Sequence, residues 1–125
     1  MINYAMLIAA LIQVESGGND GAVGDGGQAI GCLQLHPEVV EDVNRVYKTC
    51  FTPNDRFRRD RSITIAQLWL MHQETAYRKR TGKRANEETC ARIFNLGLAG
   101  HLAEPWEAEG YWRKVSAEMG EVVAP

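Results

Sequence analysis

Apolar side chains recur at intervals of three and four residues in five stretches of the chain, the spacing that puts them on one face of a helix. These stretches predict helices over about residues 3–15, 36–47, 62–81, 87–97 and 106–119. Pro37 suits a first helical position, Ser62 is expected to cap the third helix, and Gly82 is expected to close it. The segment from the end of the fourth helix to Pro105 is predicted to be a loop.

Between the first two predicted helices, the helical spacing gives way to glycine. Residues 17–31 contain seven of the chain's twelve glycines, which suggests positive φ angles or close approach by a ligand or another backbone segment. The best candidate for a strand is the run 30–35, which has one polar side chain, Gln34. The fold class is therefore mainly α, in an α+β arrangement: about five helices around one core, with a glycine-rich loop able to form a β-hairpin. Residues 1–125 are predicted to form a single domain.

Composition narrows the classes of function. The net charge of −2 provides no electrostatic footprint for nucleic acid or for an anionic membrane, and no apolar run is long enough for membrane insertion. The three histidines lie far apart in sequence, so no metal site is expected. The cysteines are an odd number without metal-type spacing, and we expect reduced thiols mostly in the core, with one disulfide plus one free thiol as the alternative: Cys32, Cys50 and Cys90.

Glu15 stands where the first predicted helix meets the glycine-rich loop. It follows Leu11 by four residues and Ile12 by three, so it continues the apolar stripe of that helix. A carboxylate in such a place is costly when ionised and is expected to hold its proton at a higher pH than usual. A general acid needs this property. The alternative is a partly exposed glutamate at a helix end with no role in chemistry.

Three sequence blocks occur in a fixed order: Glu15-Ser16-Gly17-Gly18, then Gly31-Cys32-Leu33-Gln34-Leu35, then Phe94-Asn95-Leu96-Gly97. In this order the blocks resemble the signature of the soluble lytic transglycosylase and goose-type lysozyme superfamily. The resemblance implies a lysozyme-like fold with the glycine-rich loop beside an active-site cleft. It also implies peptidoglycan glycan strands as the partner, no cofactor, and Glu15 as the general acid and base.

The resemblance assigns expected roles to further residues. Asp25 lies nine residues before Gln34, as a goose-type aspartate does, and could position a water for inversion. The alternative for Asp25 is bonding to its own loop backbone. Gln34 is expected to line the groove beside the acid and also to satisfy the loop. Asn95 could hydrogen-bond an N-acetyl group, or act as a helix C-cap.

Other positions are less decided. Ser16 could bind at the site or cap the turn, and Phe94 stands where many transglycosylases carry a tyrosine. His36 replaces a further goose-type aspartate. Sugar-stacking faces could come from four side chains near the end of the chain, although core packing is the usual role of such residues in a last helix: His101, Trp106, Tyr111 and Trp112. The basic segment 56–61 is expected to be a solvated face, with contact to an anionic wall polymer as the alternative.

The expected activity is cleavage of the β-1,4 bond between N-acetylmuramic acid and N-acetylglucosamine, most simply as a lytic transglycosylase. The alternatives are an inverting muramidase that uses Asp25, and a non-catalytic peptidoglycan-binding or assembly module. Residues 1–12 lack the basic segment of a signal peptide. We therefore expect a monomer made in the cytoplasm, of phage or prophage type, that reaches the wall in a virion or through a holin.

Overall fold

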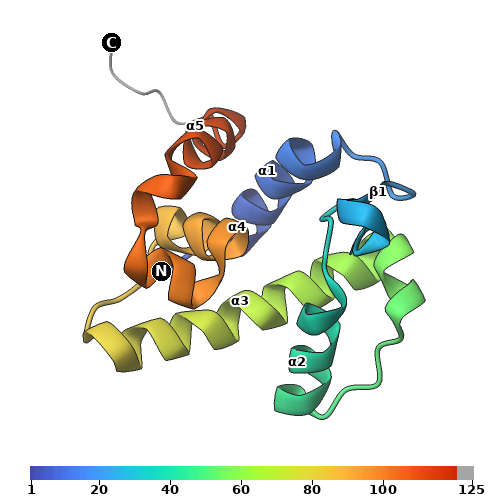
Figure 1. The fold of residues 1–125 in the computed structure, drawn as a ribbon, viewed down its shortest axis with the longest axis horizontal. Helices are drawn as coiled ribbons and strands as arrows, with labels where there is room; N and C mark the ends of the chain where they lie inside the picture. Colours follow the sequence, from blue (N-terminus) through green and yellow to red (C-terminus); the bar gives the residue numbers. More distant parts are fainter. Residues whose placement is uncertain (121–125) are drawn as a thin grey trace. The chain divides into compact units, whose positions relative to one another are not determined.

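The computed structural model describes residues 1–120, which form two compact units (Figure 1). Unit 1 combines residues 1–14 with the chain from Leu70 onward, and unit 2 consists of residues 15–69. Helices α1 (Tyr4–Ser16) and α3 (Arg59–Thr81) contribute to both units. The chain is mainly helical with one small sheet, so the predicted fold class is confirmed.

Unit 1 continues with α4 (Glu87–Ala103), η3 (Pro105–Ala108) and α5 (Glu109–Glu118), and both η3 and α5 contact α4. The apolar stripe expected for α1 is buried at Leu7, Ile8, Leu11 and Ile12, and Ala10 is buried as well, while Tyr4 at the start of the helix is half-buried. The start of α1 is tied to α4 and α3 by hydrogen bonds that the Asn3 backbone N–H donates to Glu87 and the Tyr4 hydroxyl donates to Glu74.

The fourth helix begins as predicted, because the Asn86 side chain accepts a hydrogen bond from the Thr89 backbone in a capping box. The prediction of a loop up to Pro105 is wrong. Gly97 interrupts the helix with a φ of 75°, but helical structure resumes and reaches Ala103. Residues 98–103 contain leucines and alanines, which favour a helix, and no proline to stop one. The last helix also starts later than predicted, after the η3 turn.

Unit 2 contains β1 (Val23–Gly24), η1 (Asp25–Gly27), β2 (Ala29–Ile30), α2 (Pro37–Tyr47) and η2 (Pro53–Phe57). The predicted hairpin is confirmed, because β1 and β2 pair antiparallel with Val23 opposite Ile30. The predicted strand over residues 30–35 is wrong beyond Ile30. Gly31 and Gln34 both have positive φ angles, 86° and 51°, so the chain turns and Leu35 returns to pair with Ile30.

The backbone of Arg56 lies very close to Gly31. A Cβ atom at this position would lie 1.8 Å from the carbonyl oxygen of Arg56, a distance that no side chain can occupy. The segments that end in Gly31 and Arg56 are therefore packed backbone against backbone, which only glycine allows.

Three residues predicted to mark helix boundaries have different outcomes. Pro37 occupies the start of α2 as predicted. Ser62 does not cap α3, because that helix begins at Arg59 and the buried Ser62 lies within it, its backbone N–H donating to the Arg58 carbonyl. The end of α3 is as predicted, since Gly82 follows it with a φ of 72°.

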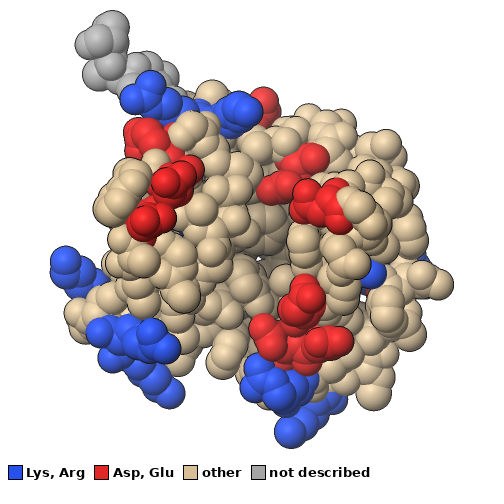
Figure 2. Space-filling model, in the orientation of Figure 1, with Lys and Arg blue, Asp and Glu red and all other residues tan. Residues whose placement is uncertain are grey.

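All three cysteines are free thiols, and two of them are buried, as expected. Within residues 1–120, no helix has the length and apolar character needed to cross a bilayer. On the face drawn in Figure 2, acidic and basic side chains form separate small groups, without a wide field of one sign. This distribution agrees with the nearly balanced charge of the sequence.

Candidate active site

Glu15 lies in the last turn of α1 and is the first residue of unit 2. Leu11 and Ile12, one turn earlier in the helix, are 0% and 4% exposed, and Glu15 itself is half-buried. A carboxyl group in this position is shielded from part of the solvent, which is the environment expected for a general acid. The role of Glu15 and its raised proton affinity stay predictions.

Ser16 closes the start of the glycine-rich loop. Its hydroxyl donates to the Cys32 carbonyl at 2.8 Å and accepts from the backbone N–H groups of Gly18 and Asn19 at 3.2 and 3.1 Å. A hydroxyl has one donor and two acceptor positions, and all three have partners inside unit 2. Ser16 therefore caps the turn, one of its two expected roles, while a contact with substrate stays a prediction.

A residue of α3 also stabilises this turn. Arg59 donates to Asp20 at 3.0 Å and to the Gly18 carbonyl. These contacts fix the backbone that directly follows Glu15, and they engage the carboxylate of Asp20.

Asp25 lies just after β1, at the tip of the hairpin, and its backbone is in the left-handed region with a φ of 49°. Its side chain is 69% exposed, and its Oδ2 atom lies 2.9 Å from Nε2 of His36. The alternative role for Asp25 was a hydrogen bond to its own loop backbone. Within residues 1–120, its side chain instead bonds to the side chain of His36. The carboxylate and the imidazole therefore link the hairpin tip to the start of α2.

Gln34 crosses the base of the hairpin. Its side-chain amide donates to the carbonyl oxygens of Ala22 and Gly31 at 3.1 and 3.0 Å. Its Oε1 atom lies against Gly24, where a Cβ atom would approach it to 2.6 Å. The amide therefore satisfies the loop, as expected, and the role beside the acid stays a prediction.

Arg56, in η2, stabilises the glycine-rich loop, a role that the sequence did not predict. We expected residues 56–61 to form a solvated face, but Arg56 is 4% exposed. It donates to the carbonyl oxygens of Gln28, Leu35 and Pro53 at 3.0, 2.7 and 2.8 Å. Burial lowers the pKa of its guanidinium, and the nearby charge of Glu38 opposes this shift. The one signal in the sequence is that Arg56 directly follows Thr52-Pro53-Asn54-Asp55, a run typical of a turn, and so precedes the other arginines.

The other basic residues of that segment fit the expectation. Arg58, Arg59 and Arg61 are exposed, and each has an acidic partner within 4 Å. The solvated, ion-paired face is therefore confirmed for these three arginines and wrong for Arg56.

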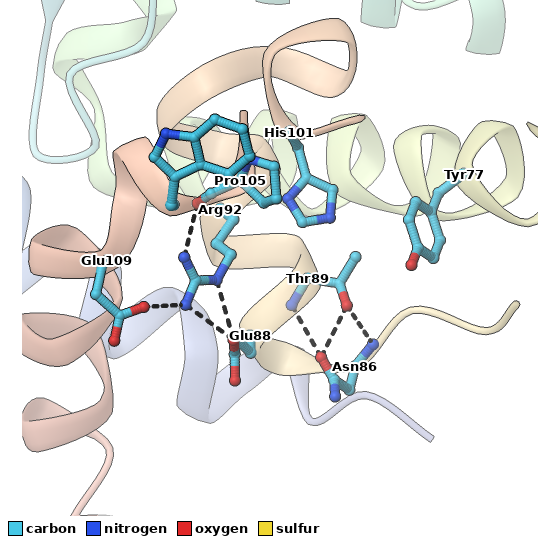
Figure 3. A pocket seen from close by; sticks show the side chains of 9 residues that line it. Tyr77, Asn86, Glu88, Thr89, Arg92, His101, Pro105 and Glu109 are labelled. Carbon is cyan, nitrogen blue, oxygen red and sulfur yellow. Dashed lines mark hydrogen bonds and ion pairs between the residues drawn. The ribbon is translucent and has the colours of Figure 1, made fainter. Parts of the chain in front are cut away.

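The remaining candidate residues belong to unit 1. Phe94 is half-buried and Asn95 is exposed, both on α4 just before the break at Gly97. His101 lies after the break and faces a pocket with Tyr77, the two ring centroids being 5.7 Å apart (Figure 3). The structure thus groups Glu15, Ser16, Asp25 and Gln34 in one unit, and Phe94, Asn95 and His101 in the other.

Comparison with protein families decides the class of this chain. A family model described as the transglycosylase SLT domain matches residues 3–104, which include all three sequence blocks. The chain belongs to the transglycosylase SLT domain family. No curated protein and no solved structure matches the chain.

Members of this family are glycan-cleaving lytic transglycosylases, and the SLT domain acts on peptidoglycan. The SLT domain described here is therefore a peptidoglycan-cleaving enzyme of the lytic transglycosylase type. Within residues 1–120 of this SLT domain, no three side chains of the metal-binding kinds come together.

Proposed function

We propose that this SLT domain cleaves the β-1,4 bond between N-acetylmuramic acid and N-acetylglucosamine, with Glu15 as general acid and then general base. The observation that carries the proposal is the position of Glu15 in the last turn of α1, one turn after Leu11 and Ile12, which are 0% and 4% exposed. Glu15 is the half-buried carboxyl group that follows an apolar helix face, as an acid that must carry a proton at neutral pH requires.

In the first step, the Glu15 carboxyl group donates its proton to the glycosidic oxygen. The bond between C1 of N-acetylmuramic acid and that oxygen breaks, its electron pair stays on the oxygen, and N-acetylglucosamine leaves as an alcohol. The sugar that remains has oxocarbenium character. Glu15 is left as a carboxylate and can act as a base in the second step.

In the second step, the Glu15 carboxylate removes the proton from the C6 hydroxyl of the same N-acetylmuramic acid. The hydroxyl oxygen forms a bond to C1, which closes a 1,6-anhydro ring and returns Glu15 to its protonated form. No water is consumed and no cofactor takes part. The alternative is attack by a water molecule, which gives a reducing end.

The surroundings of Asp25 favour the 1,6-anhydro product. A base that prepares a water for inversion acts in a place shielded from bulk solvent. The Asp25 carboxylate is 69% exposed and shares one oxygen with His36 at 2.9 Å. His36 also stands where the resemblance to goose-type lysozymes implies a further aspartate. We therefore assign Asp25 and His36 to the positioning of the hairpin tip.

Gln34 and Asn95 complete the proposal. Both N–H groups of the Gln34 side chain are used by loop carbonyls, so we propose that Gln34 shapes the groove. Asn95 is exposed and has an amide that can donate to and accept from an N-acetyl group. We propose that Asn95, together with the half-buried Phe94, contacts the substrate.

The test is digestion of purified peptidoglycan followed by mass analysis of the soluble muropeptides. The wild type is expected to release 1,6-anhydro products, and Glu15→Gln is expected to lose about 10²–10⁴-fold in rate, the usual contribution of a general acid and base. Glu41→Gln is the matched control, because Glu41 is an exposed glutamate on α2. Equal rates for Glu15→Gln and Glu41→Gln would remove Glu15 from the mechanism.

The product decides the role of Asp25. Reducing-end products that disappear in Asp25→Asn would replace the transglycosylase mechanism with inversion by water. Release of anhydro products by Asp25→Asn at a rate near that of the wild type would support our assignment. Glycan binding without release of products, on several wall types, would favour the non-catalytic module.

A further inference from the structure

Unit 1 contains a pocket of about 440 Å³ that the proposed chemistry does not use (Figure 3). Its walls come from α3, the first turns and the end of α4, η3, and the start of α5. None of the residues that line it belongs to the glycine-rich loop. The volume lies within the range of sites that bind small ligands or single sugar rings.

The charged side chains of this pocket form ion pairs with one another. Arg92 is 8% exposed and donates to Glu88 at 3.0 Å, to Glu109 at 2.6 Å and to the Pro105 carbonyl at 2.7 Å (Figure 3). All three nitrogen atoms of its guanidinium therefore donate within the pocket, and the two carboxylates offset its charge. The second oxygen of Glu109 also accepts from Arg113 at 3.4 Å. Because a carboxylate has about four acceptor positions, the pocket offers further hydrogen-bond acceptors more than it offers a free charge.

The His101 wall of the pocket is uncharged near neutral pH. Burial, followed by the charge of Arg92, lowers the pKa of His101, while Glu88 opposes the shift. The Nδ1 atom is buried and has no hydrogen-bond partner within residues 1–120. A neutral imidazole beside the Tyr77 ring gives this wall an aromatic character.

Trp106 supplies the most exposed aromatic surface of the pocket. It is 63% exposed, more than any other aromatic side chain among the exposed large apolar residues of the described chain. An indole held open beside carboxylates and an amide, that of Asn86, presents an apolar face next to hydrogen-bonding groups. Pyranose rings have the complementary surface, with an apolar C–H face and hydroxyls around the edge.

We propose that this pocket binds an N-acetylhexosamine ring of a glycan strand, with Trp106 against the face of the ring and Glu88 and Glu109 accepting from its hydroxyls. The ligand identity rests on the proposed function, because peptidoglycan is the source of such rings. The residues that form the site all lie in unit 1, so it holds a sugar without the help of the loop that follows Glu15. A second binding site of this kind keeps a glycan strand bound to the enzyme between cleavage events.

The experiment uses the full chain with Glu15→Gln, so that the ligand is not consumed, and a peptide-free N-acetylglucosamine tetramer as the probe. The chain has three tryptophans, and the indole N–H signal of Trp106 can be assigned by NMR from its loss in Trp106→Phe. Saturable movement of this signal with added tetramer is the expected result. Movement of signals from the glycine-rich loop alone, with Trp106 unmoved, would overturn the inference and leave the proposed function standing.

Binding to insoluble peptidoglycan provides the second measurement. Trp106→Ala is expected to weaken binding about tenfold, the usual effect of removing a central aromatic contact, while Trp106→Phe keeps an aromatic face and most of the affinity. Phe57→Ala is the matched control, because Phe57 is 39% exposed but belongs to unit 2. Equal binding by Trp106→Ala and Phe57→Ala would refute the site.

A competitor tests the ligand class, and activity separates the two proposals. The competitor is a free stem peptide with a lysine amine. If this peptide moves the Trp106 signal and the tetramer does not, the pocket is a cation site and the sugar assignment is overturned. Cleavage by the wild type together with no response of Trp106 defeats this inference alone. A response of Trp106 without cleavage by the wild type defeats the proposed function alone.

Discussion

Replacing Gly31 with alanine tests the packing that shapes the candidate active site. Gly31 has a φ of 86°, and its added Cβ atom would lie 1.8 Å from the Arg56 carbonyl oxygen and 2.9 Å from the carbonyl carbon. The obstacle is backbone, so no side-chain rotation can relieve it. One of the two segments has to move by more than an ångström before an ordinary contact is restored.

The cost has two sources. The left-handed backbone costs a residue with a Cβ atom about 1–2 kcal/mol. Displacement of the Arg56 segment also breaks bonds from its guanidinium to the carbonyl oxygens of Gln28 and Leu35, and a charged hydrogen bond contributes about 1.5–3 kcal/mol. With the loss of one such bond, Gly31→Ala is expected to lower the free energy of unfolding by about 2.5–5 kcal/mol, a large part of the ~5–15 kcal/mol typical of a domain.

Gly17→Ala separates the two sources. Gly17 also has a positive φ, 63°, but a Cβ atom there would meet nothing within 4 Å. This variant is expected to lose about 1–2 kcal/mol from backbone strain alone. Urea denaturation followed by circular dichroism measures both losses. Equal losses for Gly31→Ala and Gly17→Ala would refute the close packing of Gly31 on Arg56.

Three further predictions concern other parts of the chain. Arg92→Leu is expected to lower the free energy of unfolding, measured by urea denaturation, by about 2 kcal/mol, since it removes charged hydrogen bonds to carboxylates that are 45% and 49% exposed. The control Arg113→Ala changes a side chain that is 76% exposed and should alter this free energy by no more than about 0.5 kcal/mol. Equal effects of the two variants would contradict the prediction. Iodoacetamide should label the exposed Cys50 first, because Cys90 is buried and its pKa is raised to about 12; equal rates for all thiols would contradict the burial. Because burial lowers the pKa of His101 below its ordinary 6.5, the unfolded chain takes up this proton first as pH falls. The contribution of neutral His101 to the free energy of unfolding is thus complete above pH 6.5 and is lost as pH falls below it. The wild type should therefore lose more stability than His101→Gln between about pH 7.5 and 5. Equal losses of unfolding free energy for the two proteins would contradict this.

The boundaries that the sequence predicted well depend on local chemistry. The start of α4 follows from Asn86, whose side chain caps the backbone three residues later. The start of α2 follows from Pro37 and the end of α3 from Gly82. Each of these residues acts on its own neighbours, so the effect can be read without knowing where the rest of the chain lies.

The boundaries and roles that the sequence predicted poorly depend on distant segments. The apolar run from Ile30 to Leu35 has the composition of a strand, but it turns because Gly31 packs on Arg56 and the Gln34 amide bonds across the hairpin. Arg56 stands close to three exposed arginines in sequence. Its burial is set by the carbonyl oxygens of Gln28 and Leu35, which are 28 and 21 residues away along the chain.

The sequence by itself determined that five helices and a hairpin form, and the class of enzyme, because periodicity, caps and ordered motifs are local or recur across a family. Tertiary structure alone decided that Asp25 shares its carboxylate with His36 and that Arg92 donates to two glutamates and a carbonyl. It also decided that Trp106 stands open in a pocket. These features depend on which groups meet after folding, since a charge or a ring is engaged or available only in relation to its neighbours.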